Sequence, residues 1–179
     1  MSRWTTALKG AALLWLLVLG GAACAKTALP RGGTTTCLDD AGVRRLLAES
    51  RHHPILLYVW SPRMVLSAEH AHEVAAVAAD MGVQFVPVHD GRVPSTEIQE
   101  AVQAVPARAA IRPEQNVLDH SHPLCAPVLE QRDSYRHFPT AWVLHAGRLA
   151  ARPLVGAMPP SYWRQGIGLR VADHPSSMR

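Results

Sequence analysis

The spacing of apolar residues along the chain predicts an alternation of strands and helices. Residues 55–60, ILLYVW, form an uninterrupted apolar run of strand length, as in a central strand that is covered on both faces. A helical pattern over 65–81 follows and ends at Gly82, a residue type that favours the end of a helix. A second strand is predicted over 83–90. A strand, a helix and a strand in this order indicate a parallel pair joined by a right-handed crossover.

Further elements surround this unit. A helix over 36–50 is predicted before it and a short helix over 93–105 after it. The residues placed to cap these two helices are Thr36 or Asp39 for the first and Ser95 or Thr96 for the second. Residues 106–123 are polar and interrupted by proline, which predicts a long surface excursion, and excursions of this length are often functional.

The last third of the chain is predicted to add antiparallel strands. A tight turn at Ala146 and Gly147 separates two strand patterns, which indicates a β-hairpin. A short helix that carries Cys125 is expected over 123–135. The two hairpin strands are expected over 140–145 and 148–156, and a closing helix over 159–168. Together with the parallel pair, these elements predict an α/β domain with a mixed central sheet flanked by helices.

The first 23 residues have the pattern of a secretory signal. Arg3 and Lys9 precede a short apolar run at 11–19, and small residues follow it. The apolar run is too short to span a bilayer comfortably. Gly21-Ala22-Ala23-Cys24 resembles a bacterial lipobox, in which Cys24 is lipidated, although Gly21 replaces the usual large aliphatic residue. The alternative is a cut before Lys26.

Either cleavage predicts an exported bacterial protein, in the periplasm or on the periplasmic face of a membrane, with a lipid anchor as its one membrane contact. The expected segments are a signal over 1–23 and a tether over 24–36. One domain follows over 37–170, with an insertion at about 106–123, and a tail over 171–179. Loss of Arg3 and Lys9 with the signal lowers the formal net charge from +4 to +2. That charge, without a basic run, excludes a nucleic-acid partner.

Four short motifs, taken in order, resemble the thioredoxin-like superfamily. They are the strand end YVWSP at 58–62, Phe138-Pro139-Thr140, the hairpin turn at 145–148 and Leu154-Val155-Gly156-Ala157. The resemblance covers roughly residues 38–169. It implies a thioredoxin-like fold with an insertion before the hairpin, in which Pro139 is a cis-proline that faces the loop after the first central strand.

The sequence departs from this family at the residues that carry its chemistry. The positions of the two active-site cysteines hold Met64 and Ser67, and the position of the family's buried acid holds Tyr58. Thiol–disulfide exchange needs a thiolate to attack and a second thiol to resolve the mixed disulfide. A thioether and a hydroxyl supply neither, so this loop is not expected to act as a dithiol oxidoreductase.

The loop is therefore predicted to be kept for its shape. One hypothesis is a docking surface for an extended segment, formed by Trp60, Pro62, Met64, Ser67, Phe138, Pro139 and Thr140. The alternative is a filled-in site in which Met64, Val65 and Leu66 pack inward. Ser67 and His70 are spaced to touch, but no acid is placed to orient the histidine, so Ser67 is more simply read as a helix cap or as paired with a backbone carbonyl.

The cysteines outside the loop allow two further hypotheses. Cys37 and Cys125 remain as a pair when Cys24 is lipidated or removed, and exported proteins favour bridged pairs, so a disulfide is one reading. The other is a lone reactive thiol at Cys125. His120, His122 and Cys125 have a spacing that suits copper(I) or zinc, although scattered surface histidines are the more common explanation.

The sequence thus favours a binding or chaperone-like accessory protein without a cofactor. Its expected partner is an envelope protein, such as a redox or respiratory enzyme during assembly. The alternative is a thiol–disulfide or copper-handling protein that uses Cys37, Cys125 and the nearby histidines.

Overall fold

The computed structural model describes residues 37–105, 117–131 and 137–172. In chain order these residues form β1 (Leu38–Asp39), α1 (Asp40–Glu49), β2 (Ile55–Trp60), α2 (Val65–Glu69), α3 (Ala71–Asp80), β3 (Gln84–His89), α4 (Ser95–Ala104), β4 (His122–Cys125), α5 (Pro127–Glu130), β5 (Thr140–His145), β6 (Arg148–Leu149), β7 (Leu154–Val155) and α6 (Pro160–Ala172). The predicted signal and tether, residues 106–116 of the predicted excursion, and the tail beyond Ala172 lie outside the described residues.

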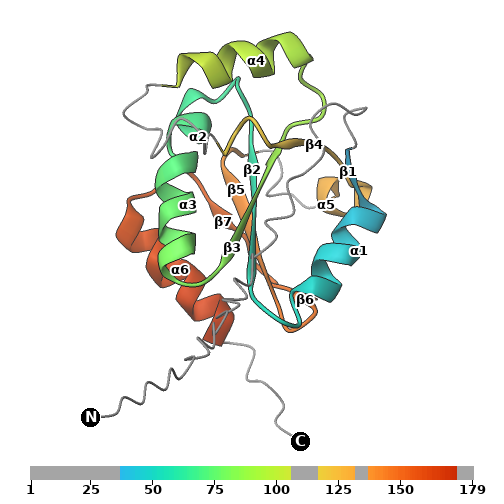
Figure 1. Ribbon diagram of the computed structural model, residues 1–179, viewed down its shortest axis with the longest axis vertical. Coiled ribbons are helices and arrows are strands. Elements are labelled where there is room, and N and C mark those ends of the chain that lie inside the picture. The colour runs from blue at the N-terminus through green and yellow to red at the C-terminus, as the bar shows by residue number, and fades with distance from the viewer. Residues whose placement is uncertain (1–36, 106–116, 132–136, 173–179) are drawn as a thin grey trace, which may run out of the picture. The chain divides into compact units, whose positions relative to one another are not determined.

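The strands form one mixed sheet, shown in Figure 1, in the order β1-β4-β3-β2-β5-β6, with β7 also paired to β5. The strands from β1 to β2 in this order are parallel, and β5 runs antiparallel to β2, β6 and β7. The predicted parallel pair is therefore β2 and β3, and the predicted mixed sheet with flanking helices is confirmed. This arrangement is a thioredoxin-like fold.

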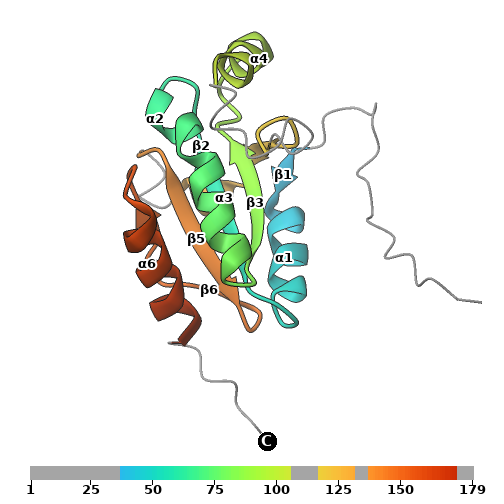
Figure 2. The same cartoon turned by 60° about the vertical axis from the view of Figure 1, so that its left-hand side comes forward.

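Both faces of the sheet are covered, which explains the uninterrupted apolar run of β2. Leu56, Tyr58 and Trp60 face a core that includes residues of α3 and α6. Ile55, Leu57 and Val59 face a second core that includes residues of α1 and α5. Figure 2 shows α3 and α6 on one side of the sheet and α1 on the other. A strand buried on both faces has no polar face to alternate with.

Helix boundaries follow the sequence closely, with three differences. The helix expected from residue 36 begins only at Asp40, because Leu38–Asp39 form β1. Asp39 caps α1, because its carboxylate accepts a hydrogen bond from the backbone N–H of Gly42 at 2.7 Å. The expected cap of α4 is wrong, since Pro94 holds that position and no side-chain bond closes the helix end. The single helix predicted over 65–81 is divided at His70 into α2 and α3.

The sequence prediction was also wrong at the short strand β4. Cys125 lies at the end of β4, whereas a helix was expected there, and α5 begins only at Pro127. β4 contains Pro123 and lacks a strand-like apolar pattern, and it pairs with β3 only at Val88 and His89. Pairing with an available neighbouring strand therefore decides its conformation.

Two other boundaries also shift. The second hairpin strand, expected over 148–156, is divided into β6 and β7, which pair with different ends of β5. The turn between β5 and β6 is confirmed, with positive φ angles of 52° at Ala146 and 76° at Gly147. α6 runs to Ala172, two residues into the predicted tail.

The sheet register brings three segments to one edge. Trp60 at the end of β2 is level with His89 at the end of β3, and Val59 is level with Thr140 at the start of β5. The loop after β2, the loop after β3 and Pro139 therefore meet at this edge. Within the described part of the chain, no helix combines the length and apolar character needed to cross a bilayer.

Candidate functional site

The loop after β2 is a tight turn that leads directly into α2. The Met64 N–H donates to the Ser61 carbonyl oxygen at 3.0 Å, and the Ser67 N–H donates to the Met64 carbonyl oxygen at 2.7 Å. Met64 thus occupies the position before the first residue of α2, without a side-chain cap. The backbone of this loop is held by its own hydrogen bonds.

Pro139 lies beside this loop and follows a cis peptide bond, as the family resemblance implies. Its carbonyl oxygen accepts a hydrogen bond from the Gly156 N–H at 2.8 Å, which ties the segment to β7. The Thr140 hydroxyl donates to the His137 carbonyl oxygen, and Thr140 is buried. Pro139 and Thr140 are therefore buried, fixed parts of the sheet edge, and Trp60 and Ser67 are buried as well. These four of the seven predicted docking residues offer no exposed surface, so the predicted docking surface is wrong at their positions.

Ser67 is buried beneath the loop, and its hydroxyl has backbone partners on several sides. The Ser67 hydroxyl lies 2.8 Å from the Ser61 carbonyl oxygen and 2.6 Å from the Met64 carbonyl oxygen, and it accepts from the Ser61 N–H at 3.0 Å. His70 instead lies 3.0 Å from the Glu73 carboxylate, so the expectation that no acid orients this histidine is wrong. Ser67 does not cap α2, and its predicted pairing with a backbone carbonyl is confirmed. Ser67 is therefore a structural residue, and the arrangement gives no nucleophile for hydrolysis.

Tyr58 lies under the loop and holds it by a hydrogen bond, at the position where the family has a buried acid. Its hydroxyl donates to the Ser67 carbonyl oxygen at 2.7 Å. Burial, and to a smaller extent the negative charge of Glu73, raise the pKa of the Tyr58 phenol far above its usual range. Tyr58 therefore stays neutral, and it supports the loop as a hydrogen-bond donor with no proton to transfer at physiological pH.

The apolar residues of the loop point outward. Met64, Val65 and Leu66, here called the apolar tip, have exposed fractions of 50%, 63% and 56%. The hypothesis that these three side chains pack inward and fill the site is therefore wrong. Three consecutive exposed apolar residues are unusual on a protein surface and are typical of an interaction site.

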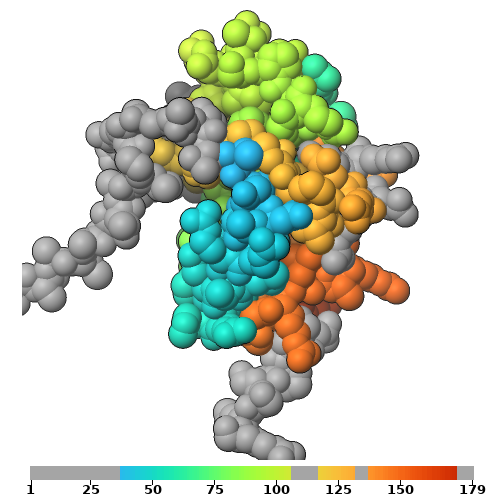
Figure 3. Space-filling model, turned by 90° about the vertical axis from the view of Figure 1, so that its right-hand side faces the viewer, coloured from blue at the N-terminus to red at the C-terminus, as the bar shows by residue number. Residues whose placement is uncertain are grey.

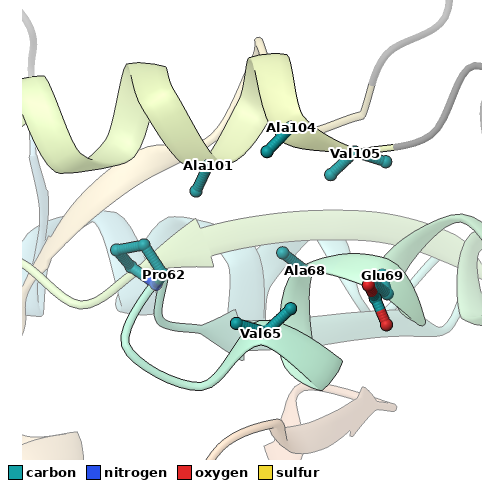
Figure 4. Close-up of a pocket in the computed structure, with 7 residues that line it drawn as sticks. All are labelled: Pro62, Val65, Ala68, Glu69, Ala101, Ala104 and Val105. Atoms are coloured by element: carbon teal, nitrogen blue, oxygen red, sulfur yellow. The ribbon is translucent and has the colours of Figure 1, made fainter.

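A small cavity lies next to the apolar tip, between α2 and α4. Its volume is about 110 Å³, and it is lined by Pro62, Val65, Ala68, Glu69, Ala101, Ala104 and Val105. Figure 4 shows the small side chains of α4 facing those of the loop and α2. Sequence reasoning missed this contribution of α4, because nothing local indicates which helix faces the loop.

Polar residues also gather at this edge. The Asp90 carboxylate is buried and binds the Arg92 guanidinium through two hydrogen bonds of 2.8 and 3.1 Å. The Asp90 N–H donates to the Trp60 carbonyl oxygen at 2.8 Å, which joins the loops after β2 and β3. Arg63 forms an exposed ion pair with Glu97 of α4 at 3.2 Å. Sequence reasoning missed these ion pairs. The available signal was Asp90, an acid that directly follows the strand β3.

The two remaining cysteines come together on the adjacent strands β1 and β4, at the β1 side of the sheet. Cys37 precedes β1, Cys125 ends β4, and their side chains interact as free thiols. Desolvation, and then the contact with Cys37 and the negative charges of Glu130 and Asp39, raise the pKa of the Cys125 thiol to about 11. The structure thus juxtaposes the predicted pair without showing a bond.

The predicted metal ligands are not brought together. His122 and Cys125 are three residues apart on β4, so their side chains leave opposite faces of the strand. Among the described residues, no three side chains of histidine, cysteine, aspartate or glutamate are grouped to hold a metal ion.

Buried histidines predict a stability that depends on pH. Desolvation lowers the pKa values of His72 and His89, and the opposing attractions of Asp119 and Asp90 do not cancel it. The unfolded chain then binds protons more readily than the folded chain. We expect the unfolding free energy to fall as pH drops below about 6.5, by up to about 1.4 kcal/mol per pH unit for each histidine.

Urea unfolding at pH 7.5, 6.5 and 5.5 measures this dependence. His72→Gln is expected to reduce the loss of stability at low pH, whereas His52→Gln, at an exposed position, serves as the control. A stability that is flat or rises between pH 7.5 and 5.5 in the unmodified protein contradicts the prediction.

Comparisons with known proteins give structural likeness only. No protein-family model and no curated protein matches the chain. Similar solved structures include a secreted Mycobacterium tuberculosis disulfide oxidoreductase homologous to E. coli DsbE, with 19% identity over 71% of this chain and 86% of that chain and a TM-score of 0.43. A thioredoxin-family thiol:disulfide interchange protein from Chlorobium tepidum has 12% identity over 69% and 83%, with a TM-score of 0.45.

A third structure, M. tuberculosis DsbF in mixed oxidised and reduced forms, has 18% identity over 65% of this chain and 80% of that chain, with a TM-score of 0.40. The fold assignment rests on the strand order and register of the chain itself.

Proposed function

We propose that this protein is an exported binding module with a chaperone-like accessory role, which docks an extended apolar segment of an envelope protein against the apolar tip. The observation that carries this proposal is the exposure of Met64, Val65 and Leu66, on a loop whose backbone is tied by hydrogen bonds at Met64 and Ser67. A rigid apolar surface loses little conformational entropy when a partner binds.

The residues under the loop support binding without redox chemistry. No sulfur able to form a thiolate is present between Trp60 and His70. The Ser67 hydroxyl is held by backbone groups and Tyr58 remains neutral, so neither a nucleophile nor a proton acceptor is available there. Recognition of an extended segment needs neither.

The neighbouring surface suits an apolar side chain within a polar frame. The cavity beside Val65 is lined mostly by aliphatic groups, with Glu69 as its one charged residue (Figure 4), and its volume is about that of a single aliphatic side chain. The exposed Arg63–Glu97 ion pair lies between the loop and α4. An apolar centre with a polar rim is the usual anatomy of a protein interface.

The choice of an envelope partner rests on the sequence. The signal pattern over 1–23 directs the chain out of the cytoplasm, and Cys24 offers a lipid anchor at the membrane. A small net charge and the absence of a basic run give no surface for nucleic acid. An envelope enzyme under assembly exposes extended apolar segments of the required kind.

Binding of defined probes tests this proposal. The probes are fluorescently labelled, unstructured peptides of about ten residues with a central leucine or valine, and a carboxymethylated, permanently unfolded model protein. Val65→Ser with Leu66→Ser is expected to weaken peptide binding about thirtyfold in fluorescence anisotropy, because two partly buried aliphatic contacts are lost. The same variant should no longer slow aggregation of the unfolded protein.

A matched control separates a local effect from a general loss of surface hydrophobicity. Val128→Ser with Leu169→Ser removes two similarly exposed aliphatic side chains from α5 and α6. This control should bind the peptides as the unmodified protein does. Equal binding by both double variants, or no binding by the unmodified protein, refutes docking at the apolar tip.

A further inference from the structure

The strand β1 lies at the edge of the sheet and is held there by few contacts. β1 has two residues, pairs with β4 alone, and is level with it only at Leu38–Leu124 and Asp39–Cys125. On the face shown in Figure 3, the blue atoms of the β1 region adjoin the gold atoms of the β4–α5 segment. A two-residue strand contributes few hydrogen bonds and frays easily.

The two thiols are placed at this weak junction. Cys37 comes directly before β1 and is half-buried, and Cys125 is the exposed last residue of β4. Their side chains interact across the two strands. The Val128 N–H also donates to the Asp40 carboxylate at 3.3 Å, so the segments that follow both cysteines are held together as well.

We propose that Cys37 and Cys125 form a disulfide in the exported protein and that this bond holds β1 against β4 as a lasting structural cross-link. The bond closes a long chain segment, which is the arrangement in which a cross-link restricts the unfolded state most. It also keeps β1 in place over the edge of β4, and a free strand edge is a site for unwanted pairing with other chains.

Bond formation follows ordinary thiol–disulfide exchange with an external disulfide, from an envelope protein or a small molecule, as the oxidant. The Cys37 thiolate attacks one sulfur of that disulfide, and the other sulfur leaves and takes up a proton. The Cys125 thiolate then attacks the Cys37 sulfur and expels the second external thiol. Two electrons pass from the pair to the oxidant, which becomes two thiols.

The surroundings of the pair favour a lasting bond over rapid exchange. Desolvation, then the contact with Cys37 and the negative charges of Glu130 and Asp39, raise the pKa of Cys125 to about 11. Little of Cys125 is then a thiolate at neutral pH, and a thiol of high pKa is also a slow leaving group. Oxidoreductase cysteines have the opposite property, a lowered pKa.

The experiment uses the full chain carrying Cys24→Ser, so that two cysteines remain, with Cys37→Ser and Cys125→Ser as further variants. Each protein is incubated with oxidised glutathione, alkylated and weighed by intact-mass spectrometry. Thermal unfolding and hydrogen exchange at the backbone amides of 122–126 are then measured with and without reduction by a phosphine.

The expected result is a mass lower by two hydrogens for the two-cysteine protein and for neither single-cysteine variant. Oxidation should raise the unfolding midpoint on the order of 10 °C and slow exchange at 122–126, with little reduction by mild dithiol. Three outcomes each overturn the proposed structural disulfide. The thiols stay free, the bond changes neither the unfolding midpoint nor the hydrogen exchange, or stoichiometric dithiol reduces the bond within seconds. Because the apolar tip contains neither cysteine, failure here leaves the peptide-binding result unaffected.

Discussion

Tyr58→Asp is expected to lower the free energy of unfolding by about 4 kcal/mol or more. The tyrosine ring is fully buried and packs against Phe85 and Trp163, with ring centres 5.4 and 6.1 Å away. Aspartate leaves a cavity of nearly a whole ring and places a carboxyl group in an apolar core. Urea unfolding at pH 7.5 measures the loss.

Tyr58→Phe is the matched control, because it keeps the ring and removes only the hydrogen bond to the Ser67 carbonyl oxygen. Its expected cost is about 1–2 kcal/mol. The difference between the two variants isolates the volume and charge of the buried group. If aspartate costs no more than phenylalanine, this core can accept an acid, and the position of Tyr58 is not committed to structural support.

Met64→Cys with Ser67→Cys is expected to create a disulfide within the loop and a disulfide reductase activity on the order of tenfold above background. The two residues are already joined by a hydrogen bond across one helical turn, from the Ser67 N–H to the Met64 carbonyl oxygen at 2.7 Å. The backbone therefore has the spacing of a dithiol loop. The measurement is reduction of a disulfide substrate, with Cys24, Cys37 and Cys125 replaced by serine.

The single variants Met64→Cys and Ser67→Cys serve as controls and should stay at background, because one thiol cannot resolve the mixed disulfide. Loss of the Ser67 hydroxyl, which bonds to Ser61 and Met64, is expected to cost about 1–3 kcal/mol of stability. Activity should remain below that of a natural dithiol protein, since Tyr58 cannot accept a proton. A double variant without a disulfide shows that the loop has lost the shape of a redox site.

Both outcomes bear on how this loop is maintained. Tyr58 and Ser67 form a connected set of contacts that holds the loop and leaves its three apolar side chains outside.

The sequence alone determined the elements whose signals are local and strong. The apolar run of β2 encodes burial on both faces, Gly82 encodes the end of α3, and Ala146-Gly147 encodes the hairpin turn. Each signal depends on side chains and backbone angles within a few residues. The cis-Pro139 and the thioredoxin-like fold also followed, through the order of four motifs.

Only the tertiary structure decided the elements and sites that depend on distant partners. β1 and β4 are short and poorly patterned, and they are strands because a neighbouring edge offers hydrogen bonds. The meeting of Cys37 with Cys125, and of α4 with the loop, results from the same long-range packing. The direction of Met64, Val65 and Leu66 was open in the sequence, because an apolar residue gives the same local signal whether it faces a core or solvent.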